Sequence, residues 1–397
     1  MQKYNFDRIV NRIGTNSYKW DNWDASTKDG KEGIALWVAD MDFETAPCIM
    51  EALKKRLEHG CFGYTLVPES YYQASINWFA RRHGWKMERD WFIYTSGVVP
   101  AISAIIKAMT QPGDKVLIQT PVYNCFFSSI RNNDCITEEM PANLDDFEKH
   151  CADPKVKVFL LCNPHNPTGH VWRKEELRTM AEICHKHGVF VIADEIHCEF
   201  INPDIDVKYT PFATVAVDNN YATCISPSKA FNIAGLQIAN IIAPDKDIRT
   251  RIDKAININE VCDVNPFGVI ALQAAYSEEG EEWLTQLNRY IYDNYAFAKE
   301  YIETHLPDWE VYPLEGTYLM WVNVEKTGMS GIKMTHHLLK EENIYVNSGS
   351  MYGDSRCIRI NLATQRKRLE EALRRIKSEC TQSDRIATSQ GCSCGKA

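Results

Sequence analysis

The chain has 397 residues, of which 45% are hydrophobic and 24% are charged, a composition typical of globular proteins and unlike that of disordered or fibrous ones. It contains 44 Lys and Arg against 53 Asp and Glu, which gives a formal net charge of −9. Nucleic acids and anionic membranes are polyanions, so an acidic chain without a basic stripe is not expected to bind either of them.

Short apolar runs alternate with helix-periodic segments in the central part of the chain. Strands are predicted at residues 115–119, 156–161, 189–193 and 222–226, with helices at 99–109 and 174–187 and further helices after residue 248. This alternation, with strands that are apolar throughout, predicts an α/β large domain built on a mostly parallel sheet covered on both faces. Active-site residues are then expected where the strands end, at the carboxyl edge of the sheet.

A different pattern begins near Trp283, where a long helical stretch runs to His305. It is followed by predicted strands at 310–312 and 318–324, a helix at 333–341, a strand at 357–361 and a last charged helix, which together indicate a smaller α+β domain. The segment around 34–38 is expected to pack with this domain. The predicted organisation is an N-terminal segment 1–48, a large domain 49–285, a small domain 286–385 and a disordered tail 386–397.

The cysteines and the N-terminal residues indicate the compartment. Several of the 14 cysteines, such as Cys162, lie inside apolar runs, where a free thiol behaves as a small hydrophobic side chain. The first ten residues lack the apolar core of a secretory signal, and no run of about 18 apolar residues could span a membrane. A reduced, cytoplasmic protein is therefore expected. Cys392 and Cys394 offer too few ligands for a metal site, which normally needs about four, so no metal is predicted.

Three polar motifs follow three successive predicted strands. Asn166 lies in the turn 163–169, which is rich in Pro and Gly, Asp194 begins Asp-Glu-Ile-His, and Lys229 ends Ser-Pro-Ser-Lys. Taken singly, each has an ordinary explanation: a turn asparagine, a helix cap and a solvated surface lysine. Together they would place an amide, a carboxylate and an amine at one edge of the sheet, where a desolvated lysine can act as a nucleophile.

The ordered set of motifs resembles the fold-type I pyridoxal-phosphate enzymes of the class I/II aminotransferase superfamily, over nearly the whole chain. Within it, the chain most resembles the carbon-sulfur β-lyase branch, which includes cystathionine β-lyases and cystalysin-like enzymes. The supporting stretches are residues 37–43, 62–65, 97–100, 121–123, 194–197 and 228–235. The resemblance implies a pyridoxal 5′-phosphate cofactor, a PLP-dependent transferase-like large domain and a homodimer.

The resemblance also implies roles for the residues of the motifs. Lys229 would attach the cofactor covalently and later move the substrate α-proton, and Asp194 would keep the ring nitrogen protonated. Asn166 would donate to the ring 3-oxygen. Tyr123, counted with Lys229 and Asp194 among the catalytic residues, would stack on the ring, although a lone Tyr is more often a half-buried packing residue.

The phosphate group needs backbone N–H donors, which a helix N-terminus provides. Gly97 precedes the predicted helix, so the amides of Val98 and Val99 are expected on the phosphate, with help from Ser226 and Ser228. Ser-Gly before a helix is otherwise most often only a cap.

Two departures from the superfamily pattern affect the predicted site. Many aminotransferases carry a phosphate-binding Arg eight positions after the lysine, where this chain has Gln237. Tyr64 is a candidate to bind cofactor and substrate from the neighbouring subunit of a dimer with shared active sites. His197 stands in the cofactor site where typical aminotransferases place Tyr, which favours the lyase branch.

Arg359 matches the superfamily arginine that binds the α-carboxylate of an amino-acid substrate as a bidentate fork, with Asn361 assisting. An ordinary structural salt bridge is the alternative for Arg359. The function implied by the resemblance is a PLP-dependent β-lyase that converts cystathionine or cysteine-type substrates to a thiol or sulfide, pyruvate and ammonia. An aminotransferase is the nearest alternative, and a PLP-binding regulatory protein that docks a transcription factor is the second.

Overall fold

The computed structural model describes residues 3–258, 260 and 263–390. The chain divides into two compact units. Unit 1 comprises residues up to Tyr4, Glu44–Asn288 and Glu315–Thr317. Unit 2 comprises Asn5–Phe43, Arg289–Leu314 and the chain from Tyr318 onward.

Unit 1 is built on a seven-stranded sheet with the order β2-β8-β7-β6-β5-β3-β4. All neighbours from β7 to β4 pair in parallel, and only β8 runs antiparallel to both of its neighbours. The strands are β2 (Phe92–Thr95), β3 (Lys115–Thr120), β4 (Ile136–Pro141), β5 (Val156–Cys162), β6 (Phe190–Asp194), β7 (Tyr221–Ile225) and β8 (Ala239–Ile242).

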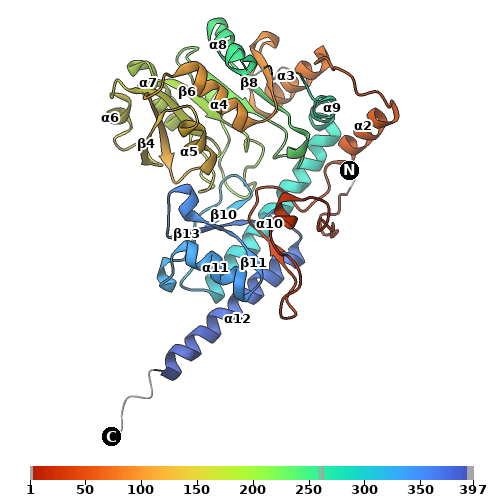
Figure 1. Ribbon diagram of the computed structural model, residues 1–397, viewed down its shortest axis with the longest axis vertical. Coiled ribbons are helices and arrows are strands. Elements are labelled where there is room, and N and C mark those ends of the chain that lie inside the picture. Colours follow the sequence, from red (N-terminus) through yellow and green to blue (C-terminus); the bar gives the residue numbers. More distant parts are fainter. Residues whose placement is uncertain (1–2, 259, 261–262, 391–397) are drawn as a thin grey trace. The chain divides into compact units, whose positions relative to one another are not determined.

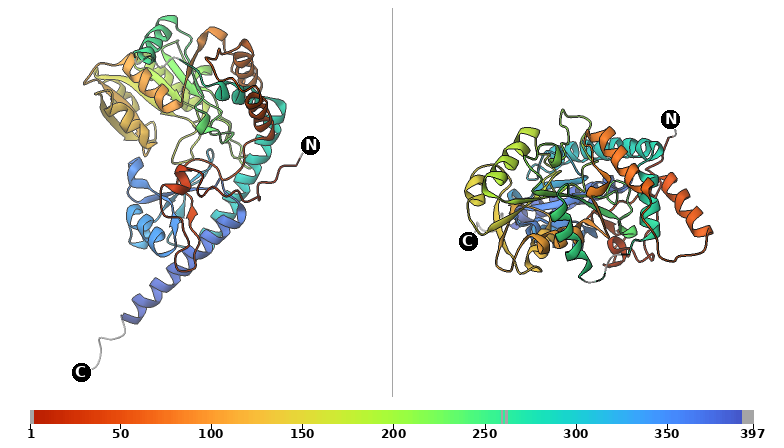
Figure 2. Two further views of the ribbon diagram at one scale, coloured as in Figure 1. Left: turned by 45° about the vertical axis from the view of Figure 1, so that its right-hand side comes forward. Right: turned by 90° about the horizontal axis from the view of Figure 1, so that it is seen from above.

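Alternate residues of these strands enter two separate cores. Leu160 and Ile192 belong to a core with α4, α5 and α8, whereas Leu161 and Val191 belong to a core with α6 and α7. Both faces are therefore buried, as a parallel sheet with crossover helices requires (Figures 1 and 2). The helices of unit 1 are α2 (Pro47–Glu58), α3 (Glu69–His83), α4 (Val98–Met109), α5 (Asn124–Arg131), α6 (Phe147–Cys151), α7 (Lys174–His187), α8 (Lys246–Asn257) and α9 (Pro266–Ala275). Short 3-10 turns lie at Arg89–Trp91, Phe212–Thr214 and Ala234–Leu236.

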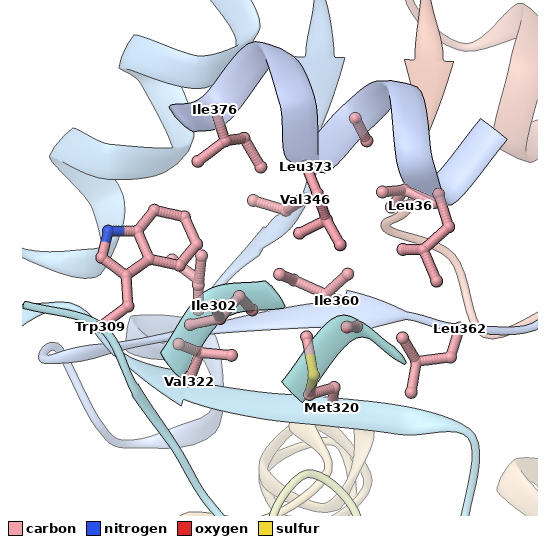
Figure 3. Packing of buried hydrophobic residues seen from close by; sticks show 14 of the residues in the cluster. Leu36, Ile302, Trp309, Met320, Val322, Val346, Ile360, Leu362, Leu373 and Ile376 are labelled. Atoms are coloured by element: carbon pink, nitrogen blue, oxygen red, sulfur yellow. The ribbon is translucent and has the colours of Figure 1, made fainter. Parts of the chain in front are cut away.

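Unit 2 has a four-stranded antiparallel sheet with the order β12-β13-β10-β9 and a parallel pair, β1 with β11. Its strands are β1 (Ile34–Ala35), β9 (Glu310–Val311), β10 (Leu319–Asn323), β11 (Ile344–Tyr345), β12 (Asn347–Ser348) and β13 (Cys357–Asn361). Its helices are α1 (Tyr18–Asp21), the C-terminal part of α10 (Glu278–His305), α11 (Gly331–Glu341) and α12 (Arg366–Gln390), with 3-10 turns at Glu325–Thr327 and Gly349–Tyr352. Residues of β10, β13, α10 and α12 form one apolar core (Figure 3).

The predicted fold class, α/β with a mostly parallel sheet and a smaller α+β part, is confirmed by this topology. The segment around residue 34 forms β1 and lies in unit 2, and the observed division falls at 43/44 and 288/289, beside the predicted 48/49 and 285/286. Helix α12 continues to Gln390, so residues 386–390 of the predicted disordered tail are helical. No glycine or proline interrupts the sequence between Arg366 and Gly391, which explains the length of the helix.

Residues 391–397, including Cys392 and Cys394, lie outside the described residues. Within the described part of the chain, no helix carries an apolar run long enough to cross a bilayer.

Candidate functional site

Three neighbouring parallel strands of unit 1, β5, β6 and β7, end at the same edge of the sheet. Asp194 is the last residue of β6 and lies in register with Cys162 of β5 and Cys224 of β7. Just beyond the strand ends, the Asn163 N–H donates to the Asp194 carbonyl oxygen at 3.0 Å. The predicted convergence of the segments carrying Asn166, Asp194 and Lys229 therefore has a structural basis in the parallel register.

The Asp194 carboxyl is almost fully buried, with 4% of the residue exposed. Burial raises its pKa to about 7, against the lowering effects of the Ile196 N–H and the charge of Lys229. The Ile196 N–H donates to Asp194 Oδ1 at 3.2 Å. The Asp194 carboxylate has thus lost most of its hydration and lies near a lysine. A site of this kind is suited to a cationic group of a ligand, which would stabilise the carboxylate charge.

Asn166 is also buried, in the turn that follows β5. Its N–H donates to the Cys162 sulfur at 3.4 Å, and the turn is closed by the His165 N–H, which donates to the His170 carbonyl at 2.7 Å. Burial lowers the pKa of His165 to about 4, so this ring is neutral at physiological pH. The turn thus has a fixed backbone and presents a buried amide beside the strand edge.

The segment after β7 carries Ser226, Ser228 and Lys229. Ser226 Oγ donates to the Ile238 carbonyl at 2.5 Å, lies 2.8 Å from Ser228 Oγ, and accepts from the Ser228 N–H at 3.0 Å. Both serines are buried, whereas Lys229 is half-buried. The turn that precedes Lys229 is thus fixed by its own hydroxyl groups.

Helix α4 begins at Val98, one residue before the predicted helix 99–109, with Gly97 at its N-cap. Pro100 consequently lies in the first turn, where its missing N–H is not needed for helix hydrogen bonds. Gly97, Val98 and Val99 occupy the N-cap and the first helical turn, and the N–H groups there have no carbonyl partner within the helix. A buried anion could be bound at this end of the twelve-residue helix.

The predicted aromatic residues of unit 1 differ in exposure. Tyr123 is half-buried at the N-cap of α5, with its ring 6.1 Å from that of Phe126, and His197 is buried with its ring 6.4 Å from that of Phe200. Tyr64, in contrast, is 95% exposed, in the irregular segment between α2 and α3. Gln237, at the position of the missing arginine, is exposed as well.

Arg359 and Asn361 lie in unit 2, on β13. Only 3% of Arg359 is exposed; its Nη2 donates to the Trp37 carbonyl at 3.0 Å, and its guanidinium lies 4.7 Å from the ring centre of Tyr352. Asn361 Nδ2 donates to the carbonyls of Val38 and Asp40 at 2.6 and 2.7 Å. Asn361 therefore orders the N-terminal segment, and its predicted contact with substrate stays a prediction, as does that of Arg359.

Glu195, beside Asp194, is a buried residue that the motifs did not single out. Its Oε1 accepts from the Phe212 N–H at 2.7 Å and its Oε2 accepts a short hydrogen bond from the Tyr209 hydroxyl. Burial raises the pKa of Glu195 to about 8, and the negative charge of Asp194 adds to the shift. The apolar run before Asp194 signals burial of both acids, but only the structure shows their different partners.

Comparisons with known proteins identify the family of the chain. The model of the family "Aminotransferase class I and II" matches residues 31–376. The chain belongs to the class I/II aminotransferase family. Among its relatives, the cystathionine beta-lyase PatB of Bacillus subtilis is 37% identical over 392 residues, which cover 94% of this chain and 99% of PatB.

Solved structures of the class I/II aminotransferase family superpose on almost the whole chain. Cystalysin from Treponema denticola, which contains a pyridoxal 5′-phosphate cofactor, has a TM-score of 0.90 at 32% identity, covering 96% of this chain and 100% of cystalysin. The PLP-bound C-S lyase from Staphylococcus hominis has a TM-score of 0.87 at 32% identity, covering 95% of this chain and 99% of that one. The predicted family is therefore confirmed.

The raised pKa of Glu195 predicts how the unfolding free energy of the protein without cofactor depends on pH. Because its pKa rises from 4.5 to about 8 on folding, its contribution to stability is complete below about pH 4.5 and is lost as the pH rises towards 8. We expect Glu195→Gln, a neutral isostere, to reduce the fall in unfolding free energy between pH 5 and 8, by up to about 1.4 kcal/mol per pH unit. Urea unfolding across this range measures the slope.

The matched control for this titration is Glu175→Gln, which changes an exposed glutamate on α7. Its slope should equal that of the wild type. If Glu195→Gln also keeps the wild-type slope, Glu195 is ionised in the folded protein and the assigned protonation is wrong.

Proposed function

We propose that the protein is a pyridoxal-phosphate-dependent carbon-sulfur β-lyase that acts on cystathionine or cysteine-type amino acids. The observation that carries the proposal is the near-complete match, at 37% identity, to a relative named cystathionine beta-lyase. The buried Asp194 beside the charge of Lys229, at the edge where three parallel strands end, is the matching structural feature.

The residues of unit 1 fit this cofactor. A pyridine nitrogen that must stay protonated needs a buried carboxylate, and Asp194 is a carboxylate whose desolvation favours such a partner. A phosphate needs backbone N–H groups and hydroxyls, which Val98, Val99 and the paired Ser226 and Ser228 supply. In our proposal Gly97, the N-cap of α4, also contacts the phosphate. Asn166 donates to the 3-oxygen, and the side chains of Tyr123 and His197 lie against the ring.

The cofactor supplies an electron sink for the pair of electrons released when the substrate Cα–H bond breaks. Lys229 would hold the cofactor covalently, and its free amine would take the Cα proton as a general base. Asp194 would keep the ring nitrogen protonated. The β-sulfur leaves as a thiol or sulfide, and the remaining three-carbon fragment takes up water to give pyruvate and ammonia.

Arg359 is proposed to bind the substrate α-carboxylate. Asn361, whose amide donates to the carbonyls of Val38 and Asp40, would assist by ordering the segment that contacts Arg359. A guanidinium offers two parallel N–H donors that match a carboxylate, and its burial in unit 2 raises the strength of such a charge-assisted pair. The hydrogen bond to the Trp37 carbonyl and the contact with the Tyr352 ring restrict the orientation of the guanidinium.

We further propose a homodimer in which Tyr64 reaches the active site of the other subunit. Large apolar side chains are concentrated on α2 and the following irregular segment, where Met50, Leu57, Phe62, Tyr64 and Leu66 are all exposed. An exposed apolar cluster of this kind is typical of an interface. A cytoplasmic location is part of the same proposal, and the ten cysteines described as free are compatible with a reducing compartment.

The reaction itself is the first test. The purified protein with pyridoxal 5′-phosphate should release pyruvate and a thiol from L-cystathionine without any added 2-oxo acid. Lys229→Ala should lower the rate by about 10²- to 10⁴-fold, because a general base is lost. Pyruvate release coupled to lactate dehydrogenase measures the rate. If product forms only when a 2-oxo acid is added, and that acid becomes aminated, the protein is an aminotransferase and the proposal is wrong.

The role of Arg359 can be tested with a substrate that lacks the carboxylate charge. Arg359→Lys keeps the charge but loses the planar fork, so KM should rise and kcat should fall, with kcat/KM decreasing by about ten- to hundredfold. Wild type should discriminate against the substrate amide much more strongly than Arg359→Ala does. Equal discrimination by the two proteins would place the carboxylate elsewhere.

Shared active sites predict complementation between two impaired variants. Tyr64→Ala and Lys229→Ala homodimers should each be impaired, but random mixing of their subunits gives hybrids in which one site has both native residues. The mixture should therefore recover about a quarter of the wild-type activity after exchange of subunits. A mixture that gives only the average of the two parents, although exchange is verified by mass spectrometry, would show that each site uses its own Tyr64.

A further inference from the structure

Glu315, Gly316 and Thr317 form a short bridge in unit 1, although the strands on either side of them in the chain, β9 and β10, belong to unit 2. The bridge contacts two segments of unit 1. One is the turn 163–169 that contains Asn166, here called the Asn166 turn, with its continuation to residue 173. The other is the segment 200–202, which follows Asp194 and His197 along the chain. These segments follow β5 and β6, the strands that bring Asn166 and Asp194 to the sheet edge.

The Glu315 side chain binds the first of these segments through three groups. Its Oε2 accepts from the Val171 N–H at 3.0 Å and from Arg173 Nη1 at 3.0 Å, and lies 3.0 Å from His170 Nδ1. Its Oε1 accepts a short hydrogen bond from Arg173 Nη2. Only 17% of the Glu315 side chain is exposed, so these charge-assisted bonds are partly shielded from water.

The main chain of the bridge joins both segments. The N–H groups of Glu315 and Gly316 donate to the Gly169 carbonyl at 3.0 and 2.7 Å. On the other side, the Glu315 carbonyl accepts from the Asn202 N–H at 2.8 Å, and the Thr317 N–H donates to the Phe200 carbonyl at 3.1 Å. The bridge is thus hydrogen-bonded to the segments after β5 and β6 at the same time.

Close packing leaves room only for glycine at the centre of the bridge. A Cβ on Gly316 would lie 2.8 Å from Pro164 Cβ and 2.8 Å from Val171 Cγ2, distances that require the Asn166 turn to move. Thr317 has a φ of +67°, a left-handed conformation that is strained for a β-branched residue and is maintained by its surroundings. Such a conformation in a fully buried threonine indicates that the position of the bridge is tightly determined.

We propose that Glu315, with Gly316 and Thr317, is a positioning element of the cofactor site, which fixes the Asn166 turn relative to the segment that follows Asp194. The inference rests on the proposed function, in which Asp194 binds the nitrogen and Asn166 the 3-oxygen of one aromatic ring. A ring held by two side chains is bound well only if the distance between them is constant. Glu315 touches no reacting group and acts through Asn166.

The test compares Glu315→Ala and the conservative Glu315→Gln with a matched control, Glu138→Ala. Glu138 on β4 resembles Glu315 in exposure and partners: 22% of its side chain is exposed, and it pairs with Lys115 Nζ and His150 Nδ1, both at 2.8 Å. Hydrogen exchange of the protein without cofactor should show faster exchange of amides in 163–171 and 200–202 for Glu315→Ala, partial recovery for Glu315→Gln, and no change there for Glu138→Ala. Unchanged exchange in Glu315→Ala would overturn the proposed positioning.

A second measurement links the bridge to Asn166. Glu315→Ala should raise the dissociation constant for pyridoxal 5′-phosphate by about tenfold and shift the pH titration of the bound cofactor's visible absorbance in the same direction as Asn166→Ala. The double variant should be no worse than Asn166→Ala alone, because the bridge acts through that residue. Additive effects would overturn the inference.

The outcomes separate the bridge from the proposed function. If Asn166→Ala shifts the titration but Glu315→Ala behaves like Glu138→Ala, the inference is wrong and the assignment of Asn166 stands. If Asn166→Ala leaves both cofactor affinity and titration unchanged, the assignment of Asn166 fails, and the inference fails with it.

Discussion

Burial of the Asp194 carboxylate is the constraint around which the candidate site is arranged. A carboxylate taken out of water is destabilised unless a cation or several N–H donors compensate for the lost hydration. Here one N–H donor and the charge of Lys229 compensate only in part, since the pKa of Asp194 is raised to about 7. A protonated pyridine nitrogen would complete this compensation. The cost of burying the Asp194 charge would then be relieved on binding, which favours the cofactor.

The surroundings of Asp194 and Glu195 affect the pKa values of these two adjacent acids differently. Two neighbouring carboxylates that are both buried repel each other if both are charged. The Tyr209 hydroxyl and the Phe212 N–H both donate to Glu195 and lower its pKa, but the loss of hydration on burial outweighs them and raises the pKa to about 8. The charge of Lys229 lowers the pKa of Asp194, whereas the charge of Asp194 raises that of Glu195. The lysine therefore favours a charged Asp194, and a charged Asp194 favours a neutral Glu195.

The parts of the site that local sequence determines were predictable. β5 and β6 lie within one residue of the predicted runs because both are apolar and end at Pro-rich or acidic motifs, and α7 matches at both ends. β4 and β8 were not recognised: β4 carries two glutamates at the sheet edge, and β8 is only four residues long. The Glu315 bridge depends on contacts with residues more than 100 positions away, so no local pattern could have indicated it.

In unit 2, the buried Arg359 is held by an ordered N-terminal segment. The Trp37 carbonyl that binds Arg359 belongs to a stretch whose next carbonyls are held by Asn361. This stretch ends at Asp42, which is fully buried. Burial would raise the pKa of Asp42, but Lys19, Arg368 and Arg12 outweigh it, and the pKa lies below its usual range.

Asp42 therefore acts as an anion buried among cations drawn from both ends of the chain. Lys19 Nζ lies 3.1 Å and Arg368 Nη1 3.3 Å from its Oδ2, and the Trp20 indole N–H donates to Oδ1 at 2.9 Å. Removing one partner from such a cluster leaves a buried charge uncompensated, which typically costs about 3 to 5 kcal/mol. The network thus gives the main chain before Asp42 one stable position, and with it the guanidinium of Arg359, whose direction matters for a planar carboxylate. The ion pairs of Asp42 in this way contribute to the geometry on which substrate recognition would depend.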